Sequence, residues 1–192
     1  MDKMCCIKLD EQLYRNYNEL YSLIFQCYKD ISMLDGYKEF QTKRSELYNN
    51  VPNISNHIVK LLQKDLALTI WKIYFDKNPK ANTIPKFRNY INNELRNSGN
   101  EYKQIKKEKL DNDSTDKLVS MRKQVLAHID ETRKDSRIEI SDLKNILDAI
   151  CKEFNNICNV VADERMIEIS EINIGLQDMA CRVELLTLYN RE

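Results

Sequence analysis

The stretch SMRKQVLAHID, residues 120–130, combines a helical pattern of apolar residues with an arginine and one of only two histidines in the chain. At about 100° per residue, Arg122 shares one arc of this helix with four apolar residues: Leu118, Met121, Val125 and Ile129. Placing an unpaired cation in an apolar contact costs on the order of several kcal/mol. We therefore expect Arg122 to meet a carboxylate, another subunit or a bound anion, with His128 about 120° away near the helix end.

The composition of the chain favours long helices. The 192 residues include only three glycines and three prolines, about 3% where average usage gives about 12%, so all-β folds with many turns are not expected. The length suits one domain with a core of its own. We predict a single all-α domain over residues 1–192, an antiparallel bundle of about four to six helices.

The spacing of apolar residues predicts where the helices lie. The expected helices are Leu9 to Leu34, closed by Asp35-Gly36; Tyr37 to Tyr48; Ser55 to Asp76; Thr83 to Arg96; one capped by Ser114 or Thr115 that ends near Ile129; Ser141 to Val161; and Leu176 to Leu186. The charge-dense residues Glu101 to Asp116 are expected to be a solvated connection, or else a place where lysines contact phosphate. Met166 to Ile174 is expected to be a short strand or an extended strap that pairs with Arg137 to Ile140.

Charge and cysteine content exclude several classes of protein. Thirty basic and thirty acidic residues cancel, so the chain lacks the basic surface of proteins that grip long nucleic-acid duplexes. The six cysteines follow no secretory leader and include no C-x-x-C pair, which favours reduced thiols in the cytoplasm and argues against a zinc site. No apolar run approaches the roughly 18 residues of a membrane span. We expect no membrane, metal or cofactor.

Motif content narrows the chemistry to one pair of residues. The sequence has no glycine-rich phosphate loop, G-x-S-x-G, H-E-x-x-H or calcium loop. His57 has no partner at ligand or relay spacing and is expected to be structural or on the surface. Arg122 and His128 remain. RNA carries its own nucleophile, the 2′-hydroxyl, so a histidine that moves protons and an arginine that stabilises the phosphate can cleave it without a metal.

The segment from Arg122 to His128 resembles the R-x(4-6)-H signature of the HEPN superfamily of all-α domains. It is most similar to the abortive-infection AbiU-type branch, in which an arginine and a lysine precede A-H-x-D on a late helix. In this chain the lysine is Lys123 and the final aspartate of the motif is Asp130. The resemblance implies that Arg122 and His128 are the catalytic pair, that Lys123 and Asp130 contribute to binding, and that a homodimer completes the site. Lys123 departs from the small polar residue that often follows the arginine in active members.

Three functions stay open at this point. The first is a metal-independent endoribonuclease of a bacterial defence system, either abortive infection or toxin–antitoxin, with RNA as substrate and an antitoxin protein as a possible partner. The second is an inactive HEPN-type module that binds a nucleotide, RNA or protein, and the third is a plain helical interaction protein. The structural alternative is a buried ion pair between Arg122 and a carboxylate, with His128 capping carbonyls at the helix end.

Overall fold

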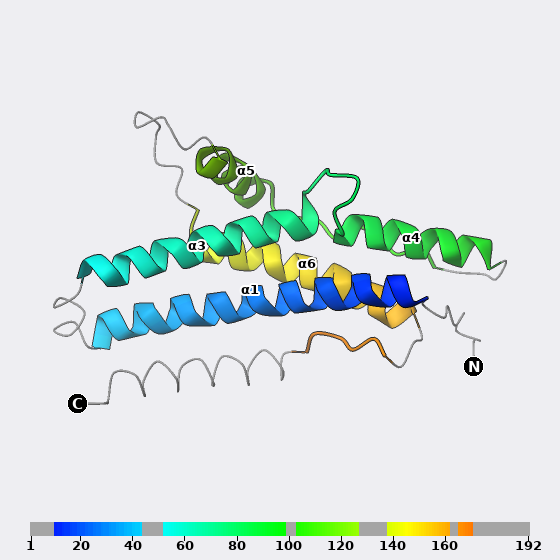
Figure 1. Cartoon of the computed structure of the whole chain (residues 1–192), viewed down its shortest axis with the longest axis horizontal. Coiled ribbons are helices and arrows are strands. Elements are labelled where there is room, and N and C mark those ends of the chain that lie inside the picture. The colour runs from blue at the N-terminus through cyan, green and yellow to red at the C-terminus, as the bar shows by residue number, and fades with distance from the viewer. Residues whose placement is uncertain (1–9, 44–51, 99–102, 127–137, 162–164, 171–192) are drawn as a thin grey trace.

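The computed structural model describes residues 10–43, 52–98, 103–126, 138–161 and 165–170. These residues form five α-helices and no strand: α1 (Glu11–Lys43), α3 (Pro52–Tyr74), α4 (Ile84–Asn97), α5 (Asn112–Leu126) and α6 (Ile140–Val160). The three long helices pack side by side, with α1 running opposite to α3 and α6, while α5 lies across α3 and α6 (Figure 1). The predicted all-α bundle is therefore confirmed.

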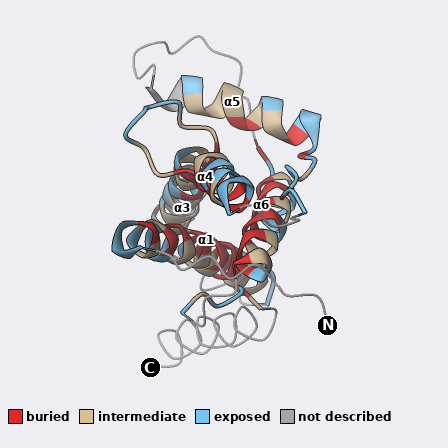
Figure 2. Cartoon of the chain, turned by 90° about the vertical axis from the view of Figure 1, so that its right-hand side faces the viewer, coloured by how far each residue is buried: buried red, intermediate tan, exposed pale blue. Residues whose placement is uncertain are grey.

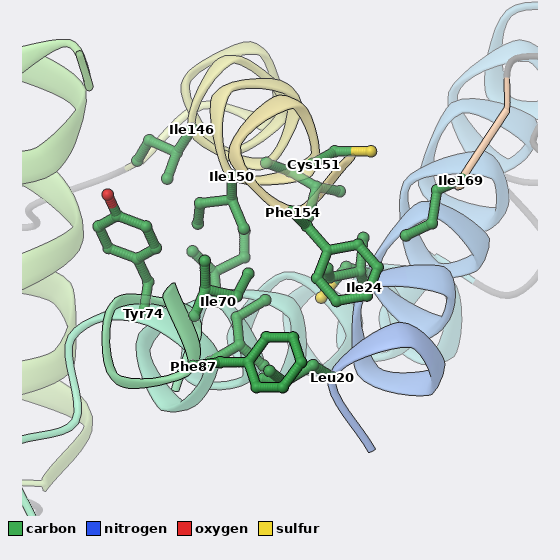
Figure 3. Packing of buried hydrophobic residues seen from close by; sticks show 14 of the residues in the cluster. Leu20, Ile24, Ile70, Tyr74, Phe87, Ile146, Ile150, Cys151, Phe154 and Ile169 are labelled. Atoms are coloured by element: carbon green, nitrogen blue, oxygen red, sulfur yellow. The ribbon is translucent and has the colours of Figure 1, made fainter. Parts of the chain in front are cut away.

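One buried core holds the helices together. Its fully enclosed members include Leu20 and Ile24 of α1, Ile70 of α3, and Ile150 and Phe154 of α6, which converge between the helices in Figure 3. Burial of each such side chain contributes roughly 1.5–3 kcal/mol. The buried side of every helix faces inward and the exposed residues lie outside (Figure 2), as the helical spacing predicts.

The first helix is longer than predicted. The sequence suggested an end at Asp35-Gly36 and a separate helix from Tyr37, but α1 continues through both residues to Lys43. A glycine inside a helix costs about 1 kcal/mol relative to alanine. Leu34 and Tyr37, on either side of it, are both buried, and their burial outweighs that cost.

The predicted starts of α4 and α6 agree with the structure to within one residue. The Thr83 hydroxyl accepts a hydrogen bond from the Lys86 amide at the start of α4, and α6 begins one residue before the predicted Ser141. The expected cap of α5 was wrong. The Asp111 carboxylate, rather than Ser114 or Thr115, accepts a hydrogen bond from the Ser114 amide at 2.8 Å, because the side chain of the residue just before the helix reaches its free N–H groups.

The connection before α5 is anchored and not simply solvated, which corrects the prediction for Glu101 to Asp116. Ile105 and Leu110 are buried, and Asn92 of α4 brackets the backbone of Ile105 with hydrogen bonds of 3.0 and 2.9 Å. The lysines of this segment alternate with these buried residues and are exposed: Lys103, Lys106, Lys107 and Lys109. The start of α5 is thereby fixed to the bundle.

Residues 165–170 form an extended strap and not a strand, so the second of the two structures predicted for this segment is the one observed. Its backbone bonds to side chains of α1 and α6, since Tyr17 and Asn155 bracket Ile167 and Ile169 respectively. The predicted pairing of these two residues with Arg137 to Ile140 is therefore wrong. Residues 171–174 of the predicted segment and the predicted helix Leu176 to Leu186 lie outside the described residues. In the described ranges, no helix has the length and apolarity of a membrane span.

Candidate functional site

Helix α5 presents Arg122 to the outer flank of α3. Leu118 is fully buried and Met121 packs against the core, which confirms the inner face expected for this helix. Arg122 is half-buried, and its guanidinium carbon lies 4.4 Å from the centroid of the Trp71 ring. The side chain of Val125 and all of Ile129 lie outside the described part. The sequence thus placed Arg122 correctly but did not identify Trp71 as its neighbour.

The arginine is stabilised by an aromatic ring and not by an acid. Within the described residues, Arg122 forms no ion pair with a carboxylate. A guanidinium on an aromatic face gains roughly 0.5–1 kcal/mol at an exposed site and about 2 kcal/mol when desolvated. The five N–H groups of arginine lie in the plane of the guanidinium. The ring is not a conventional hydrogen-bond acceptor, so these N–H groups, which have no acceptor among the described residues, are left able to donate to an anion.

Trp71 is itself held by a neighbouring aromatic residue. Its ring stacks on Phe75, the residue directly after the end of α3, with centroids 5.3 Å apart and planes 25° apart. Phe75 in turn meets the Tyr74 ring edge-on at 5.1 Å. Offset and edge-on geometries are the favourable ones for aromatic pairs. The surface on which Arg122 lies is therefore built from the last turns of α3.

Helix α5 is tied to α6 as well as to α3. The buried Ser114 hydroxyl donates to an oxygen of Asp142 at 3.2 Å. Lys117 forms an ion pair with the same carboxylate at 3.2 Å. Asp142 also bonds the backbone of Glu139 at the start of α6. These contacts fix the N-terminal half of α5 and, through it, the position of Arg122.

Arg88 shows what a purely structural arginine does in this fold. Like Arg122 it lies on an apolar arc, between Ile84 and Ile91. Arg88 pairs with Glu153 of α6 at 2.6 Å, and the Glu153 side chain is fully buried. The same carboxylate accepts hydrogen bonds from the Tyr74 hydroxyl and the Glu108 amide, both at 2.9 Å. The ion-pair alternative considered for Arg122 thus describes Arg88.

The structure describes only some of the other residues considered for the site. Lys123 is exposed beside Arg122, and His57 is exposed on α3, as expected of a surface histidine. His128 and Asp130 lie outside the described residues. The catalytic pair therefore remains a prediction. The described residues include Arg122 and its neighbours but not His128.

Three cysteines in the described part are core residues. Cys27, Cys151 and Cys158 are buried free thiols. Burial raises the pKa of Cys151 to about 11 and that of Cys158 to about 12. Neither thiol forms a thiolate readily near neutral pH, which is what a nucleophile or metal ligand requires. Cys151 and Cys158 therefore act as small apolar residues of the core.

Asp30 is a buried acid that the sequence reasoning missed. It lies on the apolar arc of α1, three residues after Cys27 and four before Leu34, so its spacing was the available signal. One oxygen accepts from Gln26 at 2.8 Å, while Oδ2 has no hydrogen-bond partner among the described groups. Burial, and secondarily the charge of Asp65, raise the pKa of this carboxyl, against the hydrogen bond from Gln26 and the charge of Lys29.

We expect Asp30→Asn to stabilise the protein at about pH 8, by about 1–3 kcal/mol, because the amide oxygen keeps the hydrogen bond from Gln26 while the buried charge, which costs more to desolvate than a neutral group, is removed. Because the folded-state pKa is raised, the folded protein binds this proton more tightly than the unfolded chain. The advantage of the variant should therefore shrink as the pH falls through the raised pKa toward about 4, the ordinary value. Urea unfolding at a series of pH values measures this, and equal stability of both proteins at about pH 8 would contradict it.

The described residues contain no group of three or more His, Cys, Asp or Glu side chains arranged to hold a metal ion. The chain matches no family model, and neither a curated protein nor a solved structure matches it.

Proposed function

We propose that this chain is a metal-independent endoribonuclease of the HEPN type that acts in a bacterial defence system. Arg122 stabilises the phosphate and His128 moves the proton. Lys123 and Asp130 contribute to RNA binding. The defence setting, abortive infection or toxin–antitoxin, a cytoplasmic location and an antitoxin partner follow from the resemblance of residues 122–130 to that family.

The observation that supports this proposal is that Arg122 contacts an aromatic ring instead of a carboxylate. Its guanidinium is half-buried against Trp71 and has no carboxylate partner in the described ranges. An arginine held against a ring is restrained in place and keeps its N–H groups for an anion. Arg88, neutralised by Glu153, has no such capacity. Of Arg88 and Arg122, the one that lacks an acid among the described residues precedes a histidine by six residues.

The chemistry needs two actions at one phosphodiester. As the 2′-hydroxyl attacks the phosphorus it loses its proton, the bond to the 5′-oxygen breaks, and that oxygen takes up a proton. His128 carries out one of these two proton transfers and water the other. Arg122 stabilises the negative charge that grows on the phosphate oxygens. The products are a 2′,3′-cyclic phosphate and a 5′-hydroxyl, so atoms and charge balance without an added reactant.

The test is cleavage of mixed RNA by the purified chain in the presence of EDTA. We expect products that end in a 2′,3′-cyclic phosphate, and no cleavage of DNA of matching sequence, since DNA lacks the nucleophile. Binding of the RNA without any turnover would favour the alternative of a catalytically inactive HEPN-type binding module. Cleavage that requires magnesium would contradict the proposal.

The proposal includes a homodimer. The resemblance to the HEPN superfamily implies that a second subunit completes the site across a two-fold axis. Light scattering at about tens of micromolar should give twice the mass of one chain. A monomer under these conditions would remove the composite site from the proposal.

A further inference from the structure

We propose that Trp71 is the positioning residue for Arg122, holding the guanidinium so that its edge faces a phosphate of the nucleic acid. This inference rests on the proposed function for its ligand class, and it adds a residue of α3 to a site that the sequence located only on α5. Trp71 touches neither the reacting phosphate nor the 2′-hydroxyl in this scheme. It acts through Arg122.

The stack accounts for how a flexible side chain is held at one orientation. Arginine loses considerable rotamer freedom when it binds an anion, and a preorganised guanidinium loses less. At 4.4 Å from the ring centroid, the guanidinium lies against the indole. A carboxylate in this place would occupy the donors that a phosphate needs. A ring holds the group and leaves those donors free.

The indole ring is a rigid support. Ile70, directly before Trp71, and Ile73, two residues after it, are fully buried, so this turn of α3 is fixed in the core. Phe75 stacks on the ring at 5.3 Å. The half-buried Trp71 therefore presents a fixed aromatic surface to α5.

The experiment uses the full chain and exploits Trp71 as its sole tryptophan. A short, fully 2′-O-methylated RNA of mixed sequence is the probe, because the blocked nucleophile allows binding without cleavage. We expect the probe to change the emission of Trp71 in the wild-type protein. In Arg122→Ala the emission should not respond to the probe, because the group that links the phosphate to the ring is gone.

Variants of Trp71 separate positioning from packing, with binding of a labelled probe measured by anisotropy. Trp71→Leu should weaken binding about tenfold, equivalent to about 1.4 kcal/mol, whereas Trp71→Phe, which keeps an aromatic face, should stay within about threefold of wild type. Leu62→Ala is the packing control. It removes a partly buried side chain of the same helix and should lower the melting temperature without weakening binding.

The outcomes divide the two proposals cleanly. RNA cleavage by the wild type with unchanged binding by Trp71→Leu overturns the positioning role and leaves the ribonuclease standing. A Trp71 emission change that depends on Arg122, in a protein that cleaves nothing, supports the positioning role in a binding module and removes the enzyme. Absence of any probe binding overturns the positioning role, and the cleavage assay decides on the ribonuclease separately.

Discussion

Glu153→Met should lower the free energy of unfolding by about 3–5 kcal/mol, the usual cost of removing one partner of a buried ion pair. The change leaves the Arg88 guanidinium, whose side chain is 12% exposed, without its acid. It also leaves the Tyr74 hydroxyl and the Glu108 amide without their acceptor. For a chain of this size, each kcal/mol corresponds to about 2–4 °C in melting temperature, so calorimetry measures the effect directly.

Two controls show whether burial of the charge is the cause. The double variant Arg88→Met/Glu153→Met should recover most of the loss, because no uncompensated charge remains in the core. Lys152→Met removes the neighbouring ion pair with Glu108, in which the lysine side chain is 67% exposed, and should cost less than about 1 kcal/mol. A Glu153→Met variant as stable as Lys152→Met would contradict the role given to this carboxylate.

The sequence predicted those parts of the fold that depend on nearby residues. The spacing of apolar positions is enough to place α3, α4 and α6 within a few residues, since one face of each helix is buried. Thr83 and Pro85 mark the start of α4 because they act on its first turn. These signals are local, and they do not require knowledge of the partner helices.

The errors arose where a distant contact outweighs a local signal. Gly36 is a typical helix terminator, yet burial of Leu34 and Tyr37 carries α1 through it. The segment before α5 has the composition of a solvated loop, but Asn92 and Glu153 bind its backbone. A sequence shows that a residue is polar, and only the packed fold shows whether another element satisfies it.

The same limit applies to the charged residues of the candidate site. The spacing that placed Arg122 among the apolar positions of α5 also marks Glu153 on α6, which lies three residues after Ile150 and four before Ile157. Spacing identifies such charges but does not assign their partners. The pairing of Glu153 with Arg88 and of Arg122 with Trp71 depends on how α3, α4, α5 and α6 cross.

Lys123→Ala is the matched control for the chemistry proposed at Arg122. Lys123 is exposed on the next position of α5, so it is available to contact phosphate as a mobile charge. Its removal should weaken RNA binding. The slope of the logarithm of affinity against the logarithm of salt concentration should fall by about 1, as expected for the loss of one phosphate contact. The cleavage rate at saturating RNA should stay close to that of the wild type.

Arg122→Ala and His128→Ala should each lower the rate of RNA cleavage by at least about 100-fold, because proton transfer and charge stabilisation each typically contribute that much. Arg122→Ala should also lose the contact with Trp71, roughly 0.5–2 kcal/mol of stability. His128→Ala, at the expected end of its helix, should leave the melting temperature nearly unchanged. Single-turnover rates, compared with melting curves, separate a chemical loss from a folding loss. Cleavage that survives either substitution would mean that this pair is not catalytic.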